Sequence, residues 1–200
     1  MRNFNEQAQI DSVNGALALR PQIEKIIDQI WEEGFDGIYF IGIGGTYASS
    51  MQVEVYMRGR SKLPVFVENA AEFLTTGNKK FTNKSVVIIS SVSGNTKEMV
   101  ELVDRVHEKG AKVFSFIDNP GTTLTQPDKQ DYLIVYPMNE QLKFYMVANY
   151  LMYKNGEFDD YTRLNDEQKK QIEFVQFHPS YDYSDFVEGL CPKINDDGSI

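Results

Sequence analysis

The chain has 200 residues, of which 42% are hydrophobic and 24% are charged. This length suits one ordinary domain plus an extension, and the composition is that of a globular protein that buries a core. The formal net charge of −9 disfavours nucleic acid or an anionic membrane as a general partner, so any anionic ligand has to be held by a local site.

The first part of the chain predicts, in order, a helix at 21–31, a strand at 37–42, a helix at 47–58, a strand at 63–67 and a short helical turn at 69–74. The first helix is amphipathic because its isoleucines and Trp31 recur with the helical period, and Gly34 ends it. The second helix has Met51 and Val55 on one face.

The second part predicts, in order, a strand at 85–90, a helix through 99–106, strands at 112–117 and 132–135, and a helix at 138–154. Residues 85–90 are apolar on both faces, which is typical of the middle of a parallel sheet. Strand and helix alternate throughout, so we expect an α/β fold. The specific expectation is a three-layer α/β/α sandwich around a five-stranded parallel sheet.

Cysteines, histidines and long apolar segments are scarce. The single cysteine, Cys191, cannot form an internal disulfide, which favours a reducing, cytoplasmic setting. The histidines His107 and His178 lie far apart, so we expect no metal site. No apolar stretch approaches the length of a membrane span, and the N-terminus has no apolar signal core. We expect a protein with no membrane partner and no cofactor.

Loops rich in small polar residues follow the strands at 37–42 and 85–90. Right-handed crossovers bring both strand ends to one edge of the sheet, which is where open α/β sheets bind ligands. In the first loop, Gly44, Gly45 and Thr46 let the backbone approach an anion at a helix start. Such a turn is also a common packing solution, so a purely structural role stays equally open.

A nucleotide fits the first loop poorly. The chain has no GxxxxGK[ST] run, which a Walker A loop requires. Tyr47 stands where the dinucleotide fingerprint needs its third glycine, although Glu68 could serve as the later acid.

The second loop places three hydroxyls around Gly94. Ser91, Ser93 and Thr96 come together with backbone amides at a helix N-terminus, and these are the groups that a phosphate monoester needs when no cation is supplied. The alternative is a serine-rich helix cap, in which Ser93 or Asn95 caps the helix. One capping residue explains one serine, but not three hydroxyls with a glycine.

The strand-GxGG[ST] segment at 37–46 and the strand-S-x-S-G-x-T segment at 85–96 resemble the sugar isomerase (SIS) domain family. The resemblance covers about residues 15–160 and implies a flavodoxin-like phosphosugar-binding domain over residues 1–160. It implies that the phosphosugar is bound by Gly44, Gly45, Thr46, Ser91, Ser93, Gly94, Asn95 and Thr96.

Within this family, the segments 71–74 (AEFL) and 141–158 are most similar to the fructoselysine-6-phosphate deglycase branch. Those enzymes carry two SIS domains, and their acid/base chemistry rests on a glutamate and a histidine of the second. We expect neither of these in this chain. Glu72 is the local acid best placed to lie near the sugar. A surface or helix-dipole role is nevertheless favoured over a catalytic one for each candidate, which are Glu72, Glu98, Glu140 and His107.

Three hypotheses for the function follow. The first is a truncated relative of the isomerases and deglycases that act on aminated sugar phosphates, the second is a non-enzymatic sugar-phosphate sensor, and the third is an inactive fragment or a domain that binds nothing. The apolar stripe at 21–31 and the aromatic residues of 138–154 exceed what a small sheet layer needs to cover it. This surplus predicts a homodimer, and the alternative is that the C-terminal extension covers these residues.

The amino-acid composition of the chain changes after Tyr161. Residues 162–171 are polar, and 172–192 (IEFVQFHPSYDYSDFVEGLCP) resemble a segment of McrB-like AAA+ NTPases, without their Walker segments. We expect residues 161–200 to be an irregular extension that is either foreign to the domain or poorly ordered.

Overall fold

The structure is a computed structural model that describes residues 5–157. Its centre is a sheet of five parallel strands in the order β2-β1-β3-β4-β5. The strands are β1 (Gly37–Gly42), β2 (Val65–Asn69), β3 (Ser85–Ser91), β4 (Lys112–Ile117) and β5 (Tyr132–Val135). The order reverses between β1 and β3, because the chain moves outward from β1 to β2 and then continues on the other side from β3.

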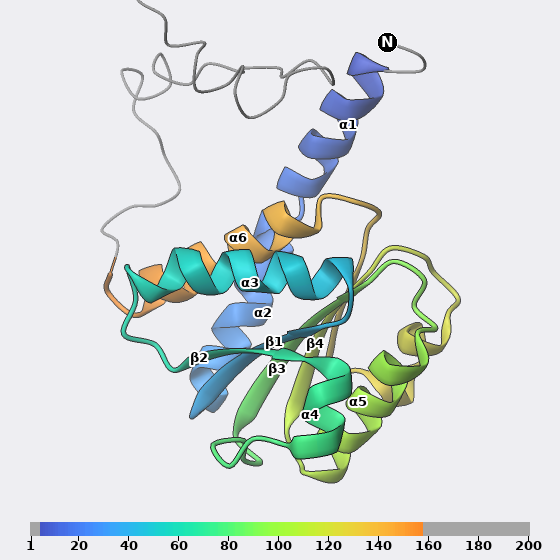
Figure 1. The fold of residues 1–200 in the computed structure, drawn as a ribbon. Coiled ribbons are helices and arrows are strands. Elements are labelled where there is room, and N and C mark those ends of the chain that lie inside the picture. Colours follow the sequence, from blue (N-terminus) through green and yellow to red (C-terminus); the bar gives the residue numbers. More distant parts are fainter. Residues whose placement is uncertain (1–4, 158–200) are drawn as a thin grey trace, which may run out of the picture. The chain divides into compact units, whose positions relative to one another are not determined.

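Helices cover both faces of this sheet (Figure 1). They are α1 (Glu6–Leu17), α2 (Arg20–Glu33), α3 (Gly45–Arg58), α4 (Ala70–Thr76), α5 (Lys97–Glu108) and α6 (Glu140–Lys154), with short 3-10 turns at Thr123–Thr125 and Pro127–Lys129. Helices α2, α3 and α6 lie on one face and α4 and α5 on the other, while α1 contacts α6. The expected three-layer α/β/α sandwich is confirmed.

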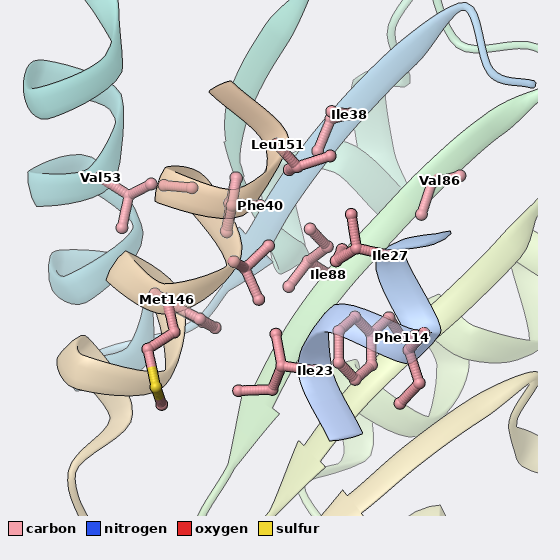
Figure 2. Close-up of a cluster of buried hydrophobic side chains, with 14 of the residues drawn as sticks. Ile23, Ile27, Ile38, Phe40, Val53, Val86, Ile88, Phe114, Met146 and Leu151 are labelled. Atoms are coloured by element: carbon pink, nitrogen blue, oxygen red, sulfur yellow. The ribbon is translucent and has the colours of Figure 1, made fainter. Parts of the chain in front are cut away.

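Two hydrophobic clusters hold the layers together. On the α2/α3/α6 side, Phe40 of β1 and Ile88 of β3 pack among side chains from all three helices (Figure 2). On the α4/α5 side, Tyr39 and Val87 from the same strands pack against Leu102 of α5. Successive residues of a strand point to opposite faces, so a strand buried on both faces must be apolar throughout. This explains why the run at 85–90 signals its place in the sheet so clearly.

The structure shifts several expected boundaries. Strand β2 begins at Val65, two residues later than expected, after Pro64, which has no N–H to donate to a ladder. Helix α6 begins at Glu140, because Met138 and Asn139 adopt left-handed backbone conformations with φ of 61° and 53°. Met51 of α3 is 41% exposed, so the apolar face noted for this helix is not its core face.

Helix α1 is the element that the sequence did not predict. It buries only Ala16, so it lacks the apolar stripe on which periodicity arguments depend. Among residues 5–157, no helix is both long and apolar enough to cross a membrane. The expected extension at 161–200 and its resemblance to McrB-like NTPases lie outside the described residues.

Candidate phosphosugar-binding pocket

A pocket of about 750 Å³ opens at the carboxyl ends of β1 and β3, where the strand order reverses. Ligands of open α/β sheets bind at this kind of position. Its walls come from the N-terminal turns of α3 and α6, the β3–α5 loop and the end of β4. The lining residues are Ile43, Gly45, Thr46, Ser49, Ser90, Ser91, Val92, Ser93, Thr96, Met99, Asp118, Met138, Asn139 and Glu140.

The loop from β1 to α3 is shaped by its glycines. Gly44 is the N-cap of α3 and has a φ of 59°, a conformation that favours glycine. A Cβ on Gly42 would lie 2.6 Å from the backbone of Thr46, so the absent side chain lets the helix start close to the strand. Thr46 Oγ1 accepts a hydrogen bond from Ile43 N and donates one to Ile43 O, both at 3.0 Å. The hydroxyl of Thr46 therefore holds the turn, and what the residue offers a ligand is its backbone N–H.

The hydroxyl groups of the β3–α5 loop make hydrogen bonds within the loop. The buried Ser91 Oγ accepts a hydrogen bond from Gly94 N at 3.1 Å. Ser93 Oγ lies 3.1 Å from Thr96 Oγ1 and accepts a hydrogen bond from Asn95 N at 3.2 Å. Helix α5 begins at the N-cap Thr96 with no side-chain capping bond. No side chain caps α5 as the serine-cap alternative expects. Met99 N donates to Thr96 O at 3.0 Å, so the amides at the start of α5 that lack a side-chain cap are those of Lys97 and Glu98.

The loop that follows β4 packs against the β3–α5 loop and supports it. Gly94 O accepts a hydrogen bond from Leu124 N at 2.9 Å, and Asn95 Oδ1 accepts from Thr123 N at 2.9 Å. Gly94 has a φ of 63°, and a Cβ there would lie 2.0 Å from Thr122 Oγ1. Asn95 and Gly94 thus fix the loop rather than line the pocket.

A buried ion pair lies beside the β3–α5 loop, where Asp118 N donates a hydrogen bond to Ser91 O at 3.1 Å. Lys143 Nζ of α6 is fully buried and donates to Asp118 Oδ1 at 3.3 Å and to Tyr136 O at 2.8 Å. Burial lowers the pKa of Lys143, and the neighbouring Asp118 carboxylate opposes that shift. Asp118 Oδ2 accepts a hydrogen bond from Met138 N at 2.9 Å, which helps to hold that residue in its left-handed conformation. Asp118 therefore lines the pocket as a carboxylate that already has a cation beside it.

The β5–α6 loop also reaches α1. Tyr136 donates from its hydroxyl to Ser12 O at 2.9 Å, and Asn139 Nδ2 donates to Ser12 Oγ at 2.7 Å. A Cβ on Gly15 would lie 1.9 Å from the Tyr136 hydroxyl, so this glycine lets the ring lie directly on α1. The loop that forms one wall of the pocket is therefore tied to α1.

The structure brings five of the expected site residues to the pocket: Gly45, Thr46, Ser91, Ser93 and Thr96. Gly44, Gly94 and Asn95 lie in the same two loops but shape them from outside the lining. Glu72 is exposed on α4 and does not line the pocket. His107 lies near the end of α5, where it pairs with Asp131 at 3.1 Å.

Sequence reasoning missed several lining residues. Ser90 ends a predicted strand that is buried throughout, where a polar residue after a run of apolar ones is a usable signal. Ser49 sits inside a predicted helix, where no pattern marks it. Asp118 directly follows a strand, and that position is a usable signal. Met138 carries no sequence mark of its left-handed backbone, whereas asparagine, the residue at 139, adopts that conformation more readily than most residues. Among the residues that the structure describes, no group of three or more potential metal ligands comes together.

Comparison with known proteins places the fold and the loops in one family. The SIS domain family matches residues 35–153. The chain is 26% identical over 136 residues to glutamine–fructose-6-phosphate aminotransferase (isomerizing) of Fusobacterium nucleatum, covering 62% of this chain and 22% of that enzyme. It is 31% identical over 105 residues to the enzyme of the same name from Methanococcus maripaludis, covering 52% of this chain and 17% of that enzyme.

Solved structures agree on the fold. A phosphosugar isomerase structure from Salmonella typhimurium superposes with a TM-score of 0.64 at 24% identity, covering 70% of this chain and 45% of that chain. The chain thus spans about a fifth of the length of the curated relatives it matches. The match over residues 35–153, with the sheet order and the two loops described above, shows that this chain belongs to the SIS domain family.

Proposed function

We propose that this domain binds a sugar phosphate, with the phosphate on the β3–α5 loop. The observation that carries the proposal is the convergence of the hydroxyls of Ser91, Ser93 and Thr96 with an uncapped helix N-terminus at one pocket. Hydroxyl groups and free N–H groups donate to phosphate oxygens, and the helix dipole favours a negative charge there. A small phosphate ester also fits a pocket of about 750 Å³.

The decisive variant is Ser93→Ala, because Ser93 is exposed in the loop and its loss removes a donor without opening the core. Calorimetric titration with fructose 6-phosphate and glucosamine 6-phosphate should give saturable binding to the wild-type protein, weakened about tenfold in the variant. Thr76→Ala removes an exposed hydroxyl at the end of α4, outside the pocket, and should bind as the wild type does. Equal affinity in wild type and Ser93→Ala would sink the proposal.

The names of the relatives support an aminated sugar phosphate as the ligand. The curated matches are aminotransferases that act on fructose 6-phosphate, and the segments at 71–74 and 141–158 resemble the fructoselysine-6-phosphate deglycase branch. Titration with fructoselysine 6-phosphate beside fructose 6-phosphate would separate these two ligands. Within the whole enzyme, this chain would then supply a binding domain whose acid and base come from elsewhere.

A sensor is the second candidate, and the hydrogen bonds from the β5–α6 loop to Ser12 favour it. A ligand that shifts this loop would also shift α1, which offers a route from the pocket to a partner. The two candidates separate by turnover: an enzyme consumes the bound sugar phosphate, and a sensor returns it unchanged.

We further propose that residues 1–160 fold as one domain in the cytoplasm and that this domain forms a homodimer. Exposed apolar side chains on α3 support the dimer, since Val55 is 65% exposed. Sedimentation equilibrium of the wild type should give twice the chain mass, and Val55→Lys should shift the protein toward the monomer. A wild type of monomer mass at every concentration would contradict the dimer.

A further inference from the structure

An unpaired hydroxyl faces the pocket from β3. Ser90 is 1% exposed and lines the pocket, and within the described part of the chain its Oγ has no hydrogen-bond partner. Burying a hydroxyl without a partner costs free energy, so native structures leave few such groups. A group of this kind at the wall of a binding pocket is best explained by a partner that arrives with the ligand.

Strand geometry fixes the side from which this hydroxyl enters. Val86 and Ile88 point into the cluster on the α2/α3/α6 face (Figure 2), and Ser90 continues the same row beyond the end of that cluster. Ser91 points to the opposite face, where its hydroxyl holds Gly94 N. The two neighbouring hydroxyls therefore belong to different parts of the pocket, with Ser91 on the side of the phosphate loop and Ser90 on the side of α3.

The residues of α3 that line the pocket are uncharged: Gly45, Thr46 and Ser49. Ser49 is 9% exposed, with its hydroxyl donating to Gly45 O at 3.3 Å. No lysine or arginine is among the described residues that line the pocket. The β3–α5 loop adds the uncapped N-terminus of α5 to its hydroxyls, which suits a phosphate, whereas Ser90 offers a hydroxyl alone from the end of a strand, which suits an uncharged oxygen of a ligand.

We propose that Ser90 is a specificity-determining residue that hydrogen-bonds a hydroxyl or carbonyl oxygen on the sugar part of the ligand. This inference rests on the proposed function, because it assumes that the phosphate occupies the β3–α5 loop. It narrows the ligand class to phosphate esters that carry such an oxygen on the carbons beyond the phosphate. A site that hydrogen-bonds a substrate hydroxyl rejects an analogue that lacks it, because the buried group then stays unpaired.

The chain offers a matched control in Ser115. This residue lies on β4, is 0% exposed, and within the described structure its Oγ likewise has no partner. It is not among the residues that line the pocket. Val113 and Ile117, two residues away on the same side of β4, belong to the cluster on the α4/α5 face. Ser90→Ala and Ser115→Ala therefore remove chemically equivalent groups, one at the pocket and one away from it.

The test compares three ligands by calorimetric titration: fructose 6-phosphate, glycerol 3-phosphate and inorganic phosphate. Ser90→Ala should weaken binding of fructose 6-phosphate about tenfold while leaving the affinity for inorganic phosphate within about twofold. Ser115→Ala should leave all three affinities unchanged, and Ser93→Ala should weaken all three. The melting temperature of both serine-to-alanine core variants should be no lower than that of the wild type, because each loses an unpaired buried hydroxyl.

The outcomes separate this inference from the proposed function. If Ser90→Ala binds fructose 6-phosphate as the wild type does, or loses inorganic phosphate to the same degree, the role of Ser90 is overturned and the phosphate site stands. If the wild type binds none of the three ligands, both proposals fail together. A tenfold loss confined to the sugar phosphate supports the assignment, and glycerol 3-phosphate then shows whether the oxygen lies on the first three carbons.

Discussion

At the scale of single residues, the pocket depends on positions where a side chain is missing as much as on those where one is present. Gly94 has a φ of 63° and lies against Thr122, so the β3–α5 loop can approach the loop behind it. The hydroxyls of Ser93 and Thr96 are then held near each other by contacts within the loop. Removing the glycine should therefore disturb the binding loop without touching a ligand-facing group.

Gly94→Ala should lower the free energy of unfolding by about 2–4 kcal/mol, because the new Cβ combines a left-handed backbone with a clash against Thr122. Gly121→Ala is the matched control. Gly121 also has a positive φ, of 73°, but nothing lies within 4 Å of a Cβ there, so the loss should be about 1 kcal/mol. Denaturant unfolding of both variants measures the difference, and equal losses would show that the contact with Thr122 carries no cost.

The sequence predicted the phosphate loop better than the rest of the pocket, for a physical reason. Ser91, Ser93 and Thr96 are close in the chain, so their spacing reveals their grouping. Ser49 and Asp118 reach the pocket only because separate strands end at the same edge of the sheet. Asn95 was predicted in the binding set, but its side chain bonds to Thr123, a contact 28 residues away that no local pattern encodes.

At the scale of helices and strands, the spacing of the apolar residues decided which elements the sequence could predict. The strands at 37–42, 112–117 and 132–135 match β1, β4 and β5 in the structure, because their short, mainly apolar runs stand out from the segments around them. Strand β1 is buried throughout, whereas the edge strand β5 is only partly buried. Helix α2 was equally clear. Helix α1 was not, since it buries only one residue and its contacts to Tyr136 and Asn139 are polar.

Helices α2 and α6 are tied by a polar contact whose strength should depend on pH. Asp28 Oδ1 lies 2.9 Å from Lys154 Nζ and accepts a hydrogen bond from the Tyr150 hydroxyl at 3.0 Å. The hydrogen bond from Lys154 lowers the pKa of Asp28, with burial opposing the shift. A lowered carboxyl pKa adds stability above its unfolded value near 3.9, and that stability is lost as pH falls through the folded value.

Asp28→Asn should therefore cost about 0.5–1 kcal/mol of unfolding free energy at neutral pH, a small effect because the Asp28 side chain is 41% exposed. The difference from wild type should shrink toward zero as the pH falls below the ordinary carboxyl range and through the lowered pKa of Asp28. Unfolding titrations at several pH values test this. Glu54→Gln, which removes an exposed pair with Arg58 within α3, is the comparison and should cost less. A difference that stays constant with pH would contradict the proposed linkage.

At the scale of the whole molecule, the charge of the protein opposes its proposed ligand. The formal net charge is −9, and among the described lining residues the charged groups are Asp118 and Glu140. Lys143, which is buried behind the wall, pairs with one of them, Asp118. Attraction for phosphate thus has to come from short-range donors and helix N-termini, which work against a long-range repulsive field.

This balance predicts an unusual salt dependence. Raising ionic strength from about 0.01 M to about 0.15 M should leave the affinity for fructose 6-phosphate unchanged or raise it, because salt screens the repulsion more than the short contacts. Calorimetric titrations should use acetate salts to limit competition from small anions. A steep loss of affinity with salt would show instead that surface cations supply the attraction.

The left-handed conformations of Met138 and Asn139 have a consequence for the engineering of this domain. A left-handed conformation costs about 1–2 kcal/mol in a residue such as methionine and less in asparagine, and glycine would avoid that cost. The chain nevertheless carries a methionine and an asparagine at the rim of its pocket, where Asp118 and Ser12 hold them. Replacing either residue by glycine should raise the thermal stability of the protein. The same replacement should loosen the loop at the rim of the pocket. At these two neighbouring residues, higher thermal stability would therefore come at the expense of ligand binding.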